Sequence, residues 1–318
     1  MARPGPSDRE KQMGGGPSGG SYAADLLERQ LKAIVGLQSG VLKDQDPEPL
    51  HQLRVRFRRL RTLLLQFGPA IVLPERVTDQ QLAKSGRRLG LVRDLDVLLE
   101  QLEHQHLPAL PGQEQGMVKP LLKSLRRGRK FAFAELGEEL RSRRYLRLLS
   151  QLQGWLRQPV VTAMGAEPAL DWLVEWKAPV LAGLLSHAGW RARDADGDAL
   201  ALHDLRKRIK QVRYGLANLE ALDPQPLGPW LERFKTSQDC LGQLNDLQVL
   251  EKALGDQLAG ELARDLPELN LQLQTEKQQL FSQWQDLAAG MLAQPLRSSL
   301  QGLLSPGGPC RSPGPGES

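Results

Sequence analysis

The chain contains the stretch LHQLRVRFRRLR at residues 50–61 and a close copy of it, LHDLRKRIKQVR, at residues 202–213. At about 100° per residue, an α-helix gathers one histidine and three cationic residues of each stretch on one face and the large apolar residues on the other. We therefore predict an amphipathic helix at each stretch, with its basic face turned away from the core. The residues of the two basic faces are His51, Arg54, Arg58 and Arg61, and His203, Arg206, Lys210 and Arg213.

A second pair of stretches repeats at the same spacing. LGLVRDLDVL at residues 89–98 corresponds to LGQLNDLQVL at residues 241–250, and the members of both pairs are 152 residues apart. Two agreements at one spacing indicate an internal duplication. We divide the body of the chain into halves at 21–154 and 166–304, joined by a segment marked by Gly and Pro.

The composition favours helices. The chain has 62 Leu but only 14 Val and 3 Ile, so its apolar residues are mostly those with high helix propensity. We predict an all-α fold with about eight helices. We expect each half to form a four-helix up-and-down bundle, the two bundles to be related by the duplication through a pseudo-twofold axis, and a basic groove to lie between them.

The two ends of the sequence and its cysteines give expectations about disorder and about the cellular location. Residues 1–20 and 305–318 are rich in Gly and Pro and poor in apolar residues, so we expect two disordered tails. The two cysteines, Cys240 and Cys310, lie far apart and outside any metal-binding spacing. Because we find neither a signal peptide nor an apolar run long enough to cross a bilayer, we expect a soluble, cytoplasmic protein without a membrane partner.

The two basic faces indicate a polyanionic ligand. Like charges three and four residues apart on one helix repel each other, and the stretch 50–61 holds five Arg and no acid. A solvated face of an amphipathic helix is the simpler interpretation of one such stretch, but its repetition favours an external anion. A third basic ridge, interrupted further along by glutamates, either contacts the same ligand or is a salt-bridged surface. Its residues are Lys119, Lys123, Arg126 and Lys130.

Each basic face begins with a histidine, which allows several interpretations. No second His or Cys lies three or four residues away, so we do not expect a metal site. His51 and His203 are hydrogen-bond donors near an anion, or bases oriented by a carboxylate, or buried residues that cap their own helices. We expect Asp94 and Asp246, one in each copy of the second motif, to hold an arginine or the histidine of the neighbouring helix.

The sequence contains no motif of a common enzymatic site. It lacks GxxxxGK(S/T), GxGxxG after a strand, GxSxG and HExxH. We therefore expect neither catalysis nor a cofactor.

The two motifs together resemble those of a known family. The pattern H-x-x-R-x-x-x-(R/K)-x-x-R of residues 51–61, followed by L-G-x-x-(R/N)-D-L-x-V and repeated once, is similar to that of the conserved-histidine α-helical domain (CHAD) family. The resemblance covers residues 21–304. It implies two four-helix bundles with a basic groove that binds inorganic polyphosphate, in some members on polyphosphate granules. Carried over by position, the ligand contacts of the family correspond to the residues of the two basic faces. The residue that follows each stretch differs between the copies: Tyr214 after the second copy fits the family pattern, whereas Thr62 occupies the equivalent position after the first.

The resemblance also bears on catalysis and on other ligands. Many relatives carry a CYTH triphosphatase domain, whose ExExK signature is absent here, so a stand-alone, non-enzymatic binder is implied. RNA or another nucleic acid is the less favoured partner, because aromatic residues make up only 5% of the chain and offer few stacking platforms. A scaffold on granules and an enzyme acting on polyphosphate are two further alternatives. The sequence carries no signal for an oligomeric state.

Overall fold

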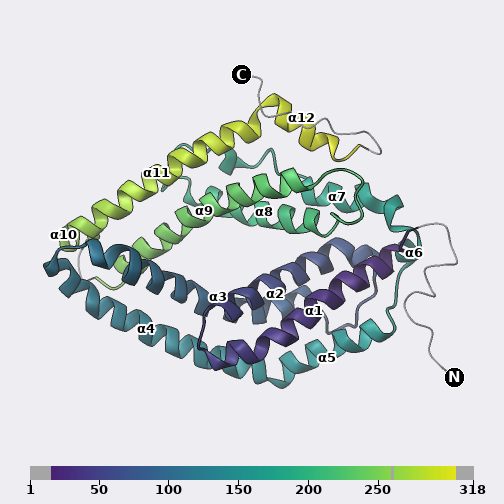
Figure 1. Ribbon diagram of the computed structural model, residues 1–318, viewed down its shortest axis with the longest axis horizontal. Helices are drawn as coiled ribbons and strands as arrows, with labels where there is room; N and C mark the ends of the chain where they lie inside the picture. The colour runs from purple at the N-terminus through teal and green to yellow at the C-terminus, as the bar shows by residue number, and fades with distance from the viewer. Residues whose placement is uncertain (1–15, 259–260, 306–318) are drawn as a thin grey trace.

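The computed structural model describes residues 16–258 and 261–305, and Figure 1 shows the arrangement of its helices. Eight α-helices of 15 residues or more make up most of this part of the chain. They are α1 (Gly19–Lys43), α2 (Glu48–Phe67), α3 (Asp79–Glu100), α4 (Gly112–Arg141), α5 (Arg143–Arg157), α8 (Ala199–Ala217), α9 (Gly228–Gly255) and α11 (Pro267–Leu292).

Shorter elements connect the long helices. The short α-helices are α6 (Ala163–Ala166), α7 (Leu173–Leu181), α10 (Leu262–Asp265) and α12 (Gln294–Gly302). The 3₁₀ turns are η2 (Gly68–Ala70), η4 (Leu107–Ala109), η5 (Ala169–Trp172) and η6 (Ala188–Arg191), and η3 (Gln101–His106) is a π-helical segment. Within the described ranges, β-pairing is limited to two isolated bridges, so the predicted all-α fold is confirmed.

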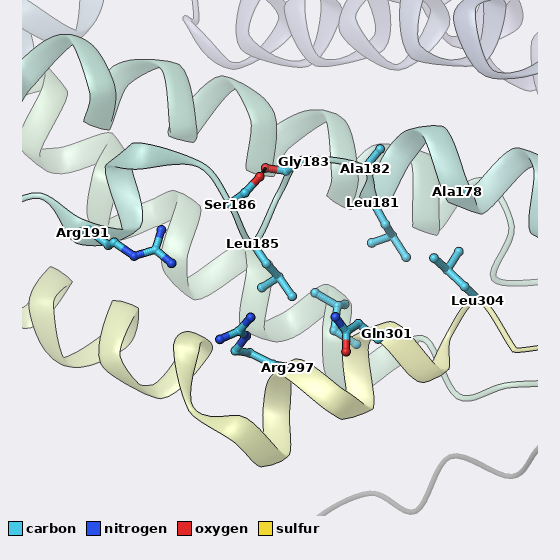
Figure 2. Close-up of a pocket in the computed structure, with 11 residues that line it drawn as sticks. Ala178, Leu181, Ala182, Gly183, Leu185, Ser186, Arg191, Arg297, Gln301 and Leu304 are labelled. Carbon is cyan, nitrogen blue, oxygen red and sulfur yellow. Dashed lines mark hydrogen bonds between the residues drawn. The ribbon is translucent and has the colours of Figure 1, made fainter.

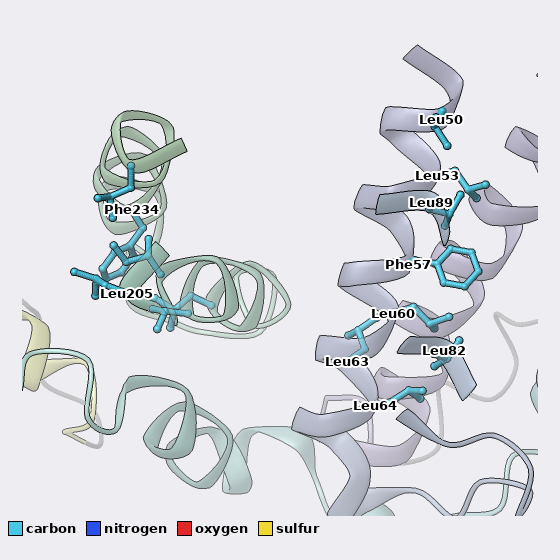
Figure 3. Packing of buried hydrophobic residues seen from close by; sticks show 14 of the residues in the cluster. Leu50, Leu53, Phe57, Leu60, Leu63, Leu64, Leu82, Leu89, Leu205 and Phe234 are labelled. Carbon is cyan, nitrogen blue, oxygen red and sulfur yellow. The ribbon is translucent and has the colours of Figure 1, made fainter. Parts of the chain in front are cut away.

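The first half of the chain folds as a bundle of long helices. α1 packs against α2, α2 against α3 and α3 against α4, while α5 packs against α1 and α4. The apolar residues of α2 recur at the spacing of one helical face, and this face is buried against the neighbouring helices. The sequence pattern of α2 thus explains its packing. Figure 3 shows this face, with Leu53, Phe57 and Leu60 of α2 beside Leu82 and Leu89 of α3.

The second half contains fewer long helices. α8 packs against α9 and against α7, α9 packs against α11, and α11 packs against α12. We expected about four helices in each half. In the described residues, five of the long helices belong to the first half and three to the second, where α7 and α12 have nine residues each.

The two halves meet near the C-terminal ends of α2 and α8. The side chain of Gln66 donates a hydrogen bond to the backbone carbonyl of Gly215 (3.0 Å) and accepts one from the side-chain amide of Asn218 (2.9 Å). The Tyr22 hydroxyl donates to the carbonyl of Asn218 at 2.7 Å. Because Gln66 and Asn218 are 152 residues apart, corresponding positions of the sequence repeat touch each other here.

A second contact joins the halves at the opposite end of the molecule, where α4 and α11 begin. The carboxylate of Glu114 is buried and accepts hydrogen bonds from the backbone N–H groups of Glu268 and Leu269, at 2.9 and 3.0 Å. These N–H groups lie in the first turn of α11, where an α-helix leaves its donors unpaired and favours a negative charge. The halves are thus fixed to each other at both ends (Figure 1).

The predicted boundary of the N-terminal tail at residue 20 is wrong by a few residues. α1 begins at Gly19, and the Ser18 hydroxyl caps it by accepting from the N–H of Ser21. A Cβ on Gly20 would lie 2.2 Å from Cγ1 of Val161, so this glycine permits close packing. A Gly-rich stretch can indicate either disorder or close packing of the backbone against a neighbour. The contact of Gly20 with Val161 shows that close packing applies here. Residues 1–15 and 306–318 of the predicted tails lie outside the described residues.

The segment that we expected to connect the two halves contains more structure than its Gly and Pro residues indicate. α5 extends to Arg157, and Ile71 and Val161 form one of the isolated bridges. α6 follows and packs against α1 and η2. Among the described helices, none is both long enough and apolar enough to cross a membrane.

Candidate functional site

The basic faces of α2 and α8 are turned towards each other. In Figure 3, Leu53 and Phe57 lie on the side of α2 away from α8, and Leu205 lies on the side of α8 away from α2. Because the basic residues occupy the opposite face of each helix, they point into the region between the two halves. Four of them interact electrostatically, and we call them the cation cluster: Arg54, Arg58, Arg206 and Lys210.

The charges of the cation cluster oppose one another. Burial, followed by the positive charges of Arg206, Arg58 and Arg54, lowers the pKa of Lys210 to about 6. Burial and then Arg54 lower the pKa of Arg58 to about 10. Among the described residues, neither Lys210 nor Arg58 has an ion-pair partner. The cluster therefore carries positive charge that the surrounding protein leaves unneutralised.

One carboxylate approaches the cluster from each half. The guanidinium of Arg54 donates to Oδ1 of Asp94 at 2.8 Å, whereas Nη2 of Arg206 lies 4.0 Å from Oδ1 of Asp246. The second distance is too long for a hydrogen bond. Each aspartate thus approaches an arginine of the neighbouring basic helix, tightly in the first copy and loosely in the second.

Glycines of the second motif lie beside these arginines. A Cβ on Gly90 would lie 3.7 Å from Nη2 of Arg54, and a Cβ on Gly242 would lie 3.7 Å from Nε of Arg206. Each guanidinium therefore lies over a glycine of the neighbouring helix. A large side chain at either glycine would occupy the space that the guanidinium uses.

The last arginine of each basic face is engaged elsewhere. Arg61 forms a two-bond ion pair with Asp79, at 2.7 and 2.9 Å, and this hydrogen bonding raises the pKa of Arg61. Asp79 is the first residue of α3, so the pair ties α2 to α3. Arg213 instead donates to the side-chain oxygen of Gln238 at 3.1 Å. The structure does not place either arginine in the cation cluster.

The two histidines lie in different surroundings. His203 hydrogen bonds through Nδ1 to the side-chain oxygen of Asn245 at 2.6 Å. His51 faces Arg93, the residue that corresponds to Asn245 in the repeat, and burial followed by this positive charge lowers the pKa of His51. His51 is therefore mainly uncharged at neutral pH and can offer an N–H donor rather than a full positive charge.

The third basic ridge is not brought to the cation cluster. Lys119, Lys123, Arg126 and Lys130 are exposed on α4. α4 packs against α3 and α5, and Figure 1 shows it on the outer side of the first half. Arg126 also forms an ion pair with Glu103 at 2.9 Å. Contact of this ridge with a ligand remains a prediction, and the ridge is separate from the residues of α2 and α8.

The sequence analysis did not identify two residues that influence this region, Arg59 and Arg93. The guanidinium carbon of Arg59 lies 5.6 Å from the ring centre of Tyr214, and that of Arg213 lies 4.9 Å from the same ring. Tyr214 is only 5% exposed, and Arg59 and Arg213 belong to different halves. Arg93 is the second omission. The signals were present in the repeat, where Arg59 corresponds to Gln211 and Arg93 to Asn245.

The arrangement is suited to binding anions. Arginine donors in a partly buried, positively charged region favour phosphate oxygens, which accept several hydrogen bonds each. The part of the chain that the structure describes contains no group of three or more His, Cys, Asp or Glu residues that could hold a metal ion. The chemistry at the junction of the halves is therefore cationic and rich in hydrogen-bond donors.

Comparisons with known proteins agree with this fold. The solved CHAD domain of the plant Ricinus communis has a TM-score of 0.63 and 26% identity, over 91% of this chain and 93% of that one. PptA from Streptomyces chartreusis has a TM-score of 0.63 and 18% identity, over 86% of this chain and 99% of that one, and shows the shared fold. No curated protein matches the chain.

The family model gives the assignment. The model described as the CHAD domain matches residues 25–255, which is more than half of the chain. This range contains both copies of each motif and all four residues of the cation cluster. The chain therefore belongs to the CHAD domain family.

Proposed function

We propose that this protein binds inorganic polyphosphate through the cation cluster and the neighbouring donors of α2 and α8. The observation that supports this proposal best is that two basic groups, Arg58 and Lys210, lie without ion-pair partners between the two halves: Arg58 is charged, and Lys210, with a pKa of about 6, takes up a proton when an anion binds. A chain of phosphates would supply the missing negative charge along both helices. The family supports this ligand class, because CHAD domains are known to bind polyphosphate.

Polyphosphate fits the site better than a nucleic acid does. Single-stranded nucleic acids gain much of their affinity by stacking bases on exposed aromatic rings. The aromatic residues of α2 and α8 nearest the cluster, Phe57 and Tyr214, are 1% and 5% exposed. A polymer without bases is bound through cations and hydrogen-bond donors alone. The absence of accessible aromatic rings in these two helices therefore does not lower its affinity.

The proposal also covers the shape of the binding site, the fate of the bound polymer and the location of the protein in the cell. The basic faces form the walls of one groove, which holds the polymer without hydrolysing it. Binding of this kind would bring a cytoplasmic protein to polyphosphate granules. Incubation with long-chain polyphosphate and Mg²⁺ should therefore leave the polymer length unchanged, and a shortening of the polymer would refute the non-enzymatic part of the proposal.

The test compares two double variants that each replace two basic side chains with glutamine. Arg58→Gln/Lys210→Gln removes two cations of the cluster without leaving a carboxylate unpaired. Lys119→Gln/Lys123→Gln removes two exposed cations from α4, and so also tests the third basic ridge. Calorimetric titrations with long-chain polyphosphate and with single-stranded RNA, at matched phosphate concentration and several salt concentrations, give the affinities.

We expect the first variant to bind polyphosphate at least about a hundredfold more weakly, because two charged hydrogen-bonding groups are lost. We expect the second variant to change affinity by less than about threefold, as for screened surface charges. Equal losses in both variants would mean that the basic surface acts generically. RNA binding as tight as polyphosphate binding would favour a nucleic-acid ligand instead.

A further inference from the structure

A pocket separate from the cation cluster lies between α7 and α12. It has a volume of about 560 Å³, within the range of small-molecule sites. One wall comes from the end of α7 and the segment that leads to η6, and the other comes from α12 and the residues that follow it. Its apolar lining consists largely of Leu181, Leu185, Leu300 and Leu304.

Two arginines line the same pocket. In Figure 2, the side chains of Arg191 and Arg297 lie at one end, and Leu181 and Leu304 lie towards the other. The lining residues include no Asp or Glu, and α12 itself contains none. The Nε atom of Arg297 is buried and has no hydrogen-bond partner in the described structure. A buried donor without a partner is unfavourable, and an anionic ligand at this end would satisfy it.

The wall formed by α7 is held in place independently of any ligand. Arg208 of α8 donates hydrogen bonds to the backbone carbonyls of Pro179, at 2.9 Å, and of Ala182. The chain then reverses at Gly183, whose φ of 71° is readily adopted only by glycine. The Ser186 hydroxyl donates to the Gly183 carbonyl at 3.1 Å and closes this turn. The pocket is therefore largely preformed.

We propose that this pocket binds a small amphipathic carboxylate with an unbranched apolar body, in the manner of a medium-chain fatty acid. The carboxylate pairs with Arg297 and Arg191, and the apolar body lies along the leucines. The planar guanidinium of Arg297 matches a carboxylate and offers it two parallel hydrogen bonds. The apolar body would remove leucine surface from water at the other end of the pocket.

The experiment uses sodium decanoate as the probe, below the concentration at which it forms micelles, and calorimetric titration of the full chain. Decanol and decyltrimethylammonium carry the same apolar body without a negative charge. We expect decanoate to bind and the other two to bind at least about tenfold more weakly, since a charged hydrogen bond is lost. Equal binding of decanoate and decanol would overturn the assignment of the arginine end.

Variants locate the site on the protein. Arg297→Gln and, separately, Arg191→Gln should each weaken decanoate binding about tenfold or more, with an unchanged unfolding temperature. Arg233→Gln removes an exposed arginine of α9 outside the pocket and should leave binding unchanged. The exposed Ser186 lines the pocket, and Ser186→Trp should fill the space and abolish binding. Undetectable binding to the wild-type chain, or unchanged binding in both Arg297→Gln and Ser186→Trp, would refute the proposal.

Discussion

The first copy of the basic motif, on α2 and α3, pairs two of the three arginines of its basic face with carboxylates, whereas the second copy, on α8 and α9, pairs its arginines less closely. Arg54 contacts Asp94 at 2.8 Å, but Arg206 lies 4.0 Å from Asp246. Arg61 forms a two-bond ion pair with Asp79, but its counterpart Arg213 meets an amide. Matching motif residues therefore differ in how much positive charge they leave for a ligand.

This difference shows what decides the strength of an anion site. The spacing of the motif determines which residues face the junction of the halves. Their neighbours on α3 and α9 determine whether the donors are already occupied. Because the second copy leaves more of its donors unoccupied, we expect it to contribute more of the binding free energy.

The largest expected effect is a dependence of polyphosphate affinity on pH that originates in the second copy. Lys210 faces Arg206 on its own helix, Arg58 and Arg54 on α2 and Asp246 on α9, and its pKa is about 6. A bound polyanion favours the charged form, so binding at neutral pH takes up a proton. Calorimetry should show affinity more than about tenfold higher at pH 6 than at pH 8, and a binding heat that depends on buffer ionisation.

Lys210→Met provides the control for this prediction. It should remove most of the pH dependence. The sign of the effect on stability is opposite. Because the unfolded chain binds the proton that buried Lys210 resists, the free energy of unfolding of the unliganded wild type falls as the pH is lowered towards 6. A wild-type affinity that does not change with pH would contradict the assigned environment of Lys210.

Replacement of arginine by lysine compares the two copies at constant charge. The Nε atom of Arg206 is buried and has no hydrogen-bond partner in the described part of the chain, whereas Arg54 already donates to Asp94. Arg206→Lys should therefore weaken polyphosphate binding about tenfold, the value of one charged hydrogen bond. Arg54→Lys should weaken it about threefold or less. Titrations of both variants at one salt concentration provide the measurement, and equal losses would show that the two copies contribute alike.

The helices and their faces could be predicted from the sequence because periodicity reports burial directly. Leu53, Phe57, Leu205 and Ile209 were expected on the apolar faces, and all are at most 1% exposed. The same periodicity predicts a face but not the neighbour that the face meets. The ridge of Lys119 therefore looked like the two basic faces, yet it lies on the outer side of the first half.

Contacts between distant segments account for what the sequence did not predict. Arg61 belongs to the same spacing as Arg54, and only the position of Asp79 at the start of α3 separates their roles. The contribution of Arg59 depends on Tyr214 of the other half, 155 residues further along the chain. No local pattern determines which acid or ring will approach a given arginine. Differences between the two copies of a repeat are the most useful sequence signal for such contacts.

The smallest expected effect concerns such a difference, at the position that is Arg93 in the first copy and Asn245 in the second. Burial and the charge of Arg93 both lower the pKa of His51. Arg93→Asn removes the charge and keeps the burial, so the pKa of His51 should rise measurably. NMR titration of the ring protons, assigned with His51→Gln, measures it.

Arg87→Asn is the matched control for this variant. Arg87 is exposed on the same helix and does not contribute to the lowered pKa of His51. Its replacement should leave the titration of His51 unchanged. If Arg93→Asn also leaves it unchanged, burial alone sets the pKa and the two copies differ less at their histidines than at their arginines. If the pKa rises, His51 becomes more often charged at neutral pH. One residue of α3 would then determine whether the first copy meets its ligand with an uncharged donor or with a cation.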